Sequence, residues 1–285
     1  MKRAAMVIAM LGITAWSFGQ STDKPATQPT PAGQQPAQAA APQGKRSPQA
    51  KTQPEYDAYK VAAALTDAAA QEKAADDFAA KFPDSELRSV LYKSAMHGYQ
   101  QSNNADKMMD MAKKVLNYDP DDPEALLGIA QVLAERTHDT DLDKDQRLAE
   151  AKKNAQHALE TAETDIPTAG QPQERIDAYK GFLRSEAYAI LGTISFNAKA
   201  WPDAETDLRK SIDAFPQQVD PIAVFRLAVA LDMQNKIPEA LKYANQAVDM
   251  TKEETAAGKA ARAEKDRLTK LSVGTAPAQT AGPPK

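Results

Sequence analysis

A run of acidic residues between two predicted helices has the spacing of a calcium-binding loop. Counting from Asp139 as position 1, acidic side chains occupy positions 1, 3, 5, 7 and 12, and the last of these is Glu150. Ca²⁺ takes carboxylate oxygens from these positions of a twelve-residue loop that joins two helices. Residues 139–150 are therefore the place where the sequence offers a candidate metal site.

Two positions depart from the EF-hand loop that this run resembles. Lys144 stands at position 6, where glycine permits a sharp turn, and its charge opposes a cation. Gln146 stands at position 8, which is usually aliphatic. The second interpretation is an inserted loop whose aspartates favour the positively polarised N-terminus of the next helix. Both interpretations stay open, and the sequence assigns the chain no metal and no other cofactor.

Motifs for catalysis are missing. His97, His138 and His157 fall on different predicted elements without HExxH spacing. There is no Gly-x-Ser-x-Gly elbow, no Walker loop and no Gly-x-Gly-x-x-Gly. The chain has no cysteine, which excludes thiolate nucleophiles, disulfides and zinc–thiolate sites. We therefore expect a protein that is not an enzyme and that acts by binding.

The elements that would position these residues are predicted to be helices. Alanine is abundant, aromatic residues make up 6% of the chain, and apolar residues recur at helical spacing from Pro54 almost to the end. A long helix is predicted over residues 173–197. The first predicted helix holds Ala58, Val61, Ala62, Leu65 and Ala69. Composition and periodicity together predict an all-α fold.

An internal duplication runs from Glu186 to Val248. Trp201 falls on Ile237 and Ala204 on Ala240, an offset of 36 positions in both cases. Self-similarity at a period of about 20–50 residues indicates stacked repeats.

The repeated residues resemble the tetratricopeptide repeat (TPR), with its Trp-x-x-Leu-Gly-x-x-Tyr, Ala-x-x-x-Phe, Ala and Pro pattern. Three units carry small residues at the eighth and twentieth positions, where the two helices of a unit approach each other: Ala130 and Ala151, Gly192 and Ala204, and Ala228 and Ala240. The second unit departs from the pattern, with Met96 and Met108 at these positions.

The resemblance implies a right-handed solenoid of helical hairpins over residues 54–272, with about five helix pairs and a C-terminal capping helix. It also implies a concave groove, lined by the first helix of each pair, that binds a protein or peptide. Carried over position by position, the groove residues are Lys93, His97, Gln101, Gln131, Asn197, Phe225 and Val229, with Gln100, Glu135, Thr193 and Asp232 beside them.

The ends of the chain have a different composition. Residues 1–19 are typical of a signal peptide, because Lys2 and Arg3 precede a largely apolar run from Ala4 to Trp16, and small residues mark a cleavage site after Gly19. Residues 20–53 are rich in Pro, Gln and Ala and predict a disordered linker. Residues 273–285 predict a disordered tail. We expect export to a bacterial periplasm or cell envelope, with no transmembrane span after cleavage.

The charge distribution narrows the choice of partner. The net charge is −4, and the positive residues of the N-terminal segments leave the predicted solenoid more acidic than that. An acidic surface repels phosphate backbones, so no nucleic acid is expected as a partner. We expect a scaffold or adaptor that binds a protein partner. The alternatives are a structural component of an envelope-assembly or division complex, a calcium-modulated module and a periplasmic enzyme.

Overall fold

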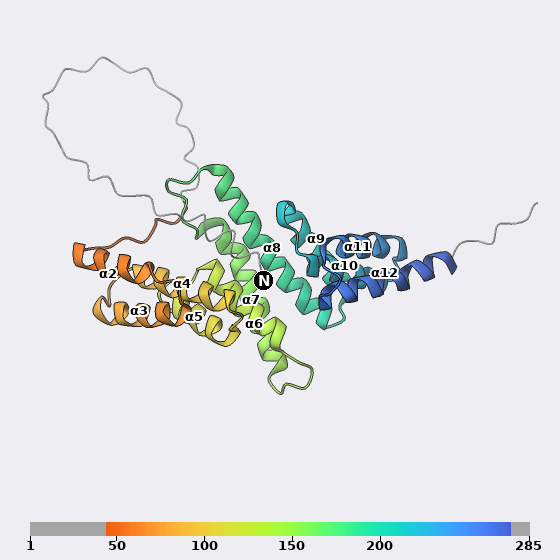
Figure 1. Cartoon of the computed structure of the whole chain (residues 1–285), viewed down its shortest axis with the longest axis horizontal. Helices are drawn as coiled ribbons and strands as arrows, with labels where there is room; N and C mark the ends of the chain where they lie inside the picture. Colours follow the sequence, from red (N-terminus) through yellow and green to blue (C-terminus); the bar gives the residue numbers. More distant parts are fainter. Residues whose placement is uncertain (1–43, 275–285) are drawn as a thin grey trace, which may run out of the picture.

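The computed structural model describes residues 44–274 and shows an all-α chain (Figure 1). Within this range there is no strand, only one isolated bridge between Lys45 and Pro167. The predicted signal peptide, most of the predicted linker and nearly all of the predicted tail lie outside the described residues. The eleven α-helices and the short 3₁₀ helix of this range are α2 (Gln53–Ala63), α3 (Ala68–Lys81), α4 (Leu87–Gln101), α5 (Ala105–Tyr118), α6 (Pro123–Arg136), α7 (Lys144–Thr164), α8 (Gln173–Asn197), α9 (Trp201–Ala214), η2 (Pro216–Gln218), α10 (Pro221–Asp232), α11 (Ile237–Met250) and α12 (Ala256–Gly274).

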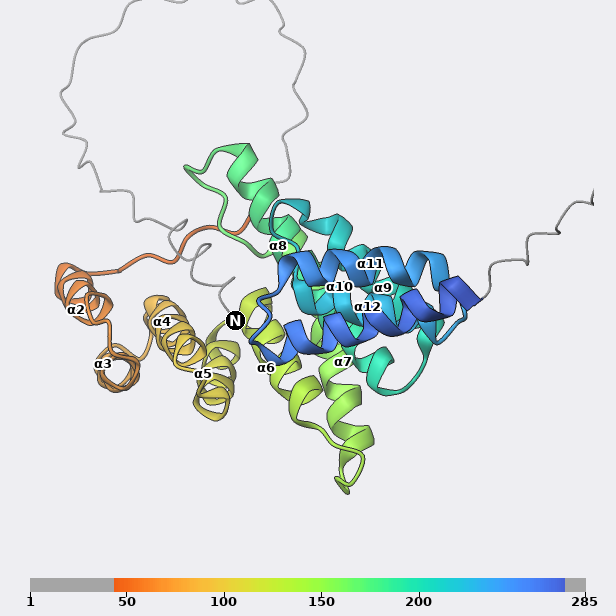
Figure 2. The same ribbon diagram turned by 45° about the vertical axis from the view of Figure 1, so that its right-hand side comes forward.

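The helices form a row of hairpins, which confirms the predicted all-α solenoid (Figure 2). The pairs α2/α3, α4/α5, α6/α7, α8/α9 and α10/α11 follow one another, and α12 packs on α11 as the final helix. The duplication is visible in the elements themselves. Helices α9 and α11 have the same length and begin at Trp201 and Ile237, the pair that the sequence aligned.

Turns inside three hairpins use the same backbone conformation. Asn103, Lys199 and Asn235 have φ angles of 57°, 58° and 59°, in the left-handed region that asparagine and glycine tolerate best. The turn predicted at residues 102–104 is thus present between α4 and α5. This conformation is unfavourable for Lys199, because it brings the Cβ atom close to the following carbonyl oxygen.

The first predicted helix is wrong at its C-terminal end. Helix α2 ends at Ala63, and the Asp67 side chain accepts a hydrogen bond from Ala70 N at 2.9 Å to begin a new helix. Val61 is 73% exposed, so it does not belong to a buried stripe. Local capping by Asp67 outweighs the apolar spacing that suggested one continuous helix.

Small residues let the paired helices approach closely, as the resemblance implies. Ala204, Ala228 and Ala240 have no exposed surface. A Cβ added to Gly192 would lie 2.7 Å from Leu208 Cγ on the partner helix, closer than real Cβ atoms come. Glycine at this position therefore sets the distance between α8 and α9.

The second hairpin, α4/α5, has large residues where the three hairpins after it have small ones. Met96 and Met108 are only 3% and 5% exposed, so the two large residues are packed inside the hairpin. The next inner helix has Gly128 facing them. The ideal Cβ position of Gly128 lies 3.6 Å from Met96 Sδ and 3.9 Å from Met108 Cε. The missing side chain of one repeat thus makes room for the larger side chains of its neighbour.

Residues 44–52, which we call the N-terminal strap, lie against the solenoid and extend its folded part beyond the predicted start at Pro54. Lys45 forms ion pairs with Asp119, which follows α5, and with Asp165 at 2.6 Å, which follows α7. Gly44 packs against the loop after α7, since an added Cβ would lie 2.8 Å from the Ile166 carbonyl oxygen. One lysine therefore links the ends of two neighbouring repeats.

Two further cations hold the strap along its length. Arg46 Nη2 lies 2.7 Å from Glu86 Oε1, just before α4. Lys51 Nζ donates to the Asp84 carbonyl oxygen at 2.7 Å. At Lys45, burial lowers the pKa of the ammonium, but the carboxylates of Asp119 and Asp165 outweigh it and the pKa is raised. Ion pairs between its basic residues and acidic residues of the solenoid thus hold the strap in place.

Candidate functional site

A cavity of about 260 Å³ opens between the first helices of the repeats. It is walled by α2, α4, α6 and α8, with a contribution from Met108 of α5. A second, smaller cavity of about 50 Å³ continues along α6 and α8 to the start of α10. We call the two together the groove. Its position on the inner helices is the one that the repeat resemblance implies.

The floor of the first cavity is apolar and pliant. The apolar side chains that line it include Val90, Met96, Met108, Leu127, Phe182 and Ile190. The two methionines have flexible, polarizable side chains that adapt to differently shaped neighbours. Gly128 also lines the wall and leaves the floor open between them. Burying a further apolar group on such a surface is favourable.

A cluster of polar side chains stands on the same wall, with Glu124 at its centre. Tyr179 Oη donates to Glu124 Oε1 at 2.6 Å, and His97 Nε2 lies 2.8 Å from Glu124 Oε2. Lys93 Nζ lies 3.2 Å from Glu124 Oε1 and also forms an ion pair with Asp122. The cluster joins α4, α6 and α8, so it ties three successive repeats together at the groove.

Desolvation makes these contacts strong. The Glu124 and Lys93 side chains are 15% and 21% exposed. Burial alone would raise the pKa of Glu124, but Lys93 and His97 attract its charge and hold the pKa well below its usual range. Burial opposes the charge of Lys93, yet Asp122 and Glu124 raise its pKa. Burial and Glu124 together raise the pKa of Tyr179 well above its usual value. Lys93 and Glu124 are therefore charged and Tyr179 is neutral at physiological pH.

The second cavity holds an arginine and an excess of carboxylates. Arg226 of α10 donates to Thr193 Oγ1 of α8 at 2.7 Å, and burial lowers the pKa of its guanidinium, which stays charged at any physiological pH. Glu135, Glu186 and Asp220 line the same cavity. Asp220 also accepts from Ile222 N at 3.1 Å as the cap of α10.

The predicted groove residues fall into two groups. Lys93, His97 and Gln131 line the first cavity, and Gln131 lines the second as well. Gln100 lies on the first cavity, and Glu135 and Thr193 lie on the second. Gln101 and Asn197 are exposed and line neither cavity.

The predicted apolar patch lies elsewhere. Phe225 is half-buried and packs against Val224, Ala247 and Ala261 near the C-terminal end. Val229 is half-buried and lines neither cavity. Asp232 forms an ion pair with Arg267 of α12. The apolar floor of the groove is thus built by the second to fourth repeats rather than by the fifth.

Sequence reasoning missed Glu124 and Tyr179. Glu124 occupies the second position of the third repeat, one of the positions that resemblance assigns to the groove, and it meets the fifth and ninth positions of the repeat before it, Lys93 and His97. The alignment of the repeats alone would therefore have placed Glu124 in the groove. Tyr179 belongs to an N-terminal extension of the long helix α8, for which the repeat pattern has no position.

The histidines do not assemble a nucleophile. His97 is occupied by Glu124, and the nearby Ser94 donates to the Val90 carbonyl oxygen at 3.2 Å. His157 lies 2.7 Å from Asp121, outside the groove. The polar cluster around Glu124 fixes the relative positions of α4, α6 and α8.

The acidic run at residues 139–150 does not form a twelve-residue loop. Helix α7 begins at Lys144, so positions 6 to 12 of the run are helical. Lys144 Nζ lies 2.6 Å from Asp139 Oδ1 and occupies a carboxylate that calcium would need. Over residues 44–274 no group of three or more His, Asp or Glu side chains is placed to hold a metal ion. The same range contains no helix that is long and apolar enough to span a membrane.

Comparisons with solved structures find a structural likeness. No family model and no curated protein matches the chain. A solved structure described as the assembly chaperone of RpL4 (Acl4) is similar with a TM-score of 0.39 and 12% sequence identity. The match covers 77% of this chain and 98% of that chain.

Proposed function

We propose that the chain is a protein-binding scaffold whose groove takes a peptide or a helix from a partner protein. The observation that carries this proposal is the cavity of about 260 Å³ on the inner helices, with an apolar floor beside a fixed polar cluster. A ligand cavity is typically mostly apolar with a few placed polar groups. The polar cluster joins three repeats, so a partner meets a surface that is already in place.

The proposed setting is the periplasm or cell envelope of a bacterium. Support comes from the sequence of residues 1–19, with its basic start, its short apolar run and its small residues near Gly19. Mass spectrometry of the exported protein tests this directly. We expect a mature N-terminus at Gln20, and an exported chain that retains Met1 would contradict the proposal.

The groove is tested by site-specific photo-crosslinking of the full chain in envelope extract. Gln131 lines both cavities, whereas Gln156 is exposed on the outer helix α7, so the two glutamines form a matched pair. A crosslinking side chain at Gln131 should give a discrete product with a partner protein, and the same group at Gln156 should not. Products only from Gln156 would instead support a structural role through the outer face.

A blocking variant provides the second arm. Gln131→Trp places a large side chain where the two cavities meet, and Gln156→Trp adds the same bulk outside. If the groove binds the partner, Gln131→Trp should abolish the co-purification that Gln156→Trp leaves intact. Phe225 is not suitable for this purpose, since its ring is part of the packing near α12.

A further inference from the structure

The groove is lined by more acidic than basic side chains, and this excess of negative charge favours a cationic partner. Of the described residues, Lys93 is the one Lys or Arg side chain that lines the first cavity, where the carboxylates of Glu124 and Glu186 also lie. On the second cavity Arg226 stands among Glu135, Glu186 and Asp220. Acidic side chains therefore outnumber Lys and Arg side chains on both stretches of the groove.

Two of these carboxylates are not used by the solenoid as ion pairs. Over the described residues, Glu135 and Asp220 form no ion pair within 4.0 Å, although the charges of both attract the guanidinium of Arg226. Glu135 is exposed and accepts only from the Gln131 amide at 3.1 Å. Asp220 accepts from a backbone N–H. They come from different repeats, α6 and the start of α10, and they flank the same small cavity.

The apolar floor and the acidic rim lie end to end. The floor of the first cavity occupies the α4–α6–α8 stretch, and the unpaired carboxylates stand at the α6–α8–α10 stretch. Gln131 and Ile190 line both cavities and mark where one passes into the other. A segment that lies along the groove would meet apolar side chains first and carboxylates next.

The chain already holds one basic segment by acidic residues. In the strap, Lys45 is bound by Asp119 and Asp165, and Arg46 is bound by Glu86. These contacts lie on a different part of the solenoid from the groove and use other carboxylates. They show that extended cationic sequence is compatible with the acidic surface of this solenoid.

We infer that the groove is a docking surface for a cationic amphipathic segment of a partner protein. The apolar face of the segment is buried on the floor made by the second to fourth repeats, and Lys or Arg side chains at its end pair with Glu135 and Asp220. This inference rests on the proposed function and specifies its partner. An acidic segment is repelled at the same place, so the groove selects by charge as well as by shape.

The test uses the full chain and three labelled peptides with one leucine pattern. Leucines recur at helical spacing, and the polar positions are all Lys, all Gln or all Glu. Fluorescence anisotropy measures each affinity. The Lys peptide should bind at least about tenfold more tightly than the Gln peptide, the Glu peptide should bind weakest, and added salt should weaken the Lys peptide most.

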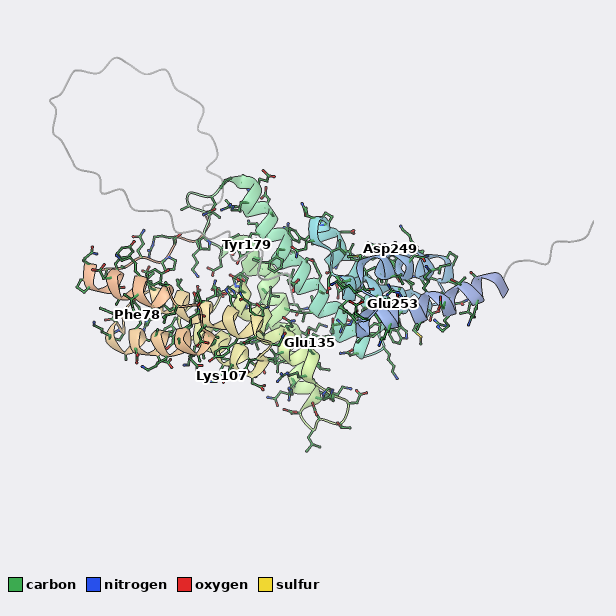
Figure 3. The ribbon with its side chains drawn as sticks, viewed as in Figure 1. Phe78, Lys107, Glu135, Tyr179, Asp249 and Glu253 are labelled. Carbon is green, nitrogen blue, oxygen red and sulfur yellow. The ribbon has the colours of Figure 1, made fainter. Side chains whose placement is uncertain are left out.

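Matched variants separate the groove from the net charge of the protein. Glu135→Gln with Asp220→Asn removes two negative charges, and the asparagine retains an oxygen that caps α10. Asp249→Asn with Glu253→Gln removes two charges from exposed positions at the end of α11 and in the loop after it (Figure 3), and neither residue lines either cavity. The groove pair should weaken the Lys peptide about fivefold and leave the Gln peptide unchanged. The control pair should change neither.

The outcomes are distinguishable. If the Gln and Glu peptides bind as tightly as the Lys peptide and Gln131→Trp abolishes all three, groove binding stands and the charge inference is overturned. If the control pair weakens the Lys peptide as much as the groove pair, the attraction is general and the inference is also overturned. If no peptide binds and no crosslink forms at Gln131, the proposed function itself fails. Glu135→Gln alone repeats the measurement should the double variant unfold.

Discussion

Removing the Glu124 carboxylate should destabilise the protein more than any other single change at the groove wall. Glu124→Ala deletes the acceptor for Tyr179 at 2.6 Å, the contact with His97 at 2.8 Å and the contact with Lys93 at 3.2 Å. Its side chain is 15% exposed, so water replaces little of what is lost. Breaking a buried pair by removing one partner costs about 3–5 kcal/mol, and we expect a loss of this size in the free energy of unfolding.

A double-mutant cycle isolates the share that belongs to Tyr179. Tyr179→Phe keeps the ring and removes one hydrogen bond to a charged acceptor, worth about 1.5–3 kcal/mol. In the Glu124→Ala background this hydroxyl has already lost that acceptor, so the second change should cost little. The coupling energy is therefore expected to be about 2 kcal/mol.

Urea titration followed by far-UV circular dichroism measures all four proteins. Equal slopes of the free energy against urea must be verified, because repeat arrays do not always unfold in one step. Glu135→Ala on the same helix is the control, since Glu135 is exposed and its side chain accepts one hydrogen bond, from Gln131. It should change stability by no more than about 0.5 kcal/mol. A Glu124→Ala protein as stable as this control, or a coupling energy near zero, would refute the reasoning.

Three other perturbations address packing, the strap and pH. Gly192→Ala should destabilise by about 1–2 kcal/mol because its Cβ meets Leu208, whereas Gly128→Ala has room and should be neutral or stabilising; thermal unfolding of the two variants compares them, and equal shifts would contradict the packing argument. Lys45→Met leaves Asp119 and Asp165 without their shared cation, so limited proteolysis should cut within residues 44–52 severalfold faster than in the unchanged chain, while Lys259→Met, at an exposed position of α12, should not alter that rate. Burial and the bond to Glu72 raise the pKa of Tyr99 to about 12, so its contribution to stability is complete below pH 10 and is lost as the pH rises toward 12. Tyr99→Phe should flatten that alkaline decline, as measured by denaturant titration at several pH values. The lowered pKa of Glu124 has the opposite sense, with stability that is present above about pH 4.5 and is lost as the pH falls.

The architecture was predictable because each repeat carries its own local signals. Small residues such as Ala204 and Ala240 mark where paired helices meet, and the 36-residue offset fixes the register of the neighbours. The boundary between α2 and α3 was not predictable from periodicity. There the apolar spacing continues past Asp67, but the hydrogen bond from Ala70 N to the Asp67 side chain starts a new helix.

The groove was predictable in position and less so in content. Lys93, His97 and Gln131 follow from repeat register alone. The pairing of His97 with Glu124 depends on how one repeat is rotated on the next, and the contribution of Tyr179 depends on the added turns of α8. Phe225 was predicted to line the groove, but it packs against residues of α11 and α12 at the end of the array. The repeat pattern does not describe this packing.

Residues 44–52 likewise escaped prediction, because their composition is that of a spacer and their contacts are made through three isolated cations. Lys45, Arg46 and Lys51 carry no periodic pattern, and their partners lie more than thirty positions away in the sequence. Such ion pairs depend on where the folded solenoid places the acidic residues at its helix ends. Composition alone does not give these positions.

The strap also determines how mechanical load would enter the molecule. A pull on the chain at Gly44 reaches Lys45 first and is divided between Asp119 and Asp165, at the ends of α5 and α7. The first hairpin, α2/α3, lies beyond Thr52 and is bypassed until these ion pairs and the contacts of Arg46 and Lys51 part. Because charged contacts weaken with salt while the buried hairpins do not, the same pull would be borne by the middle of the array in dilute buffer and by its first hairpin in concentrated salt.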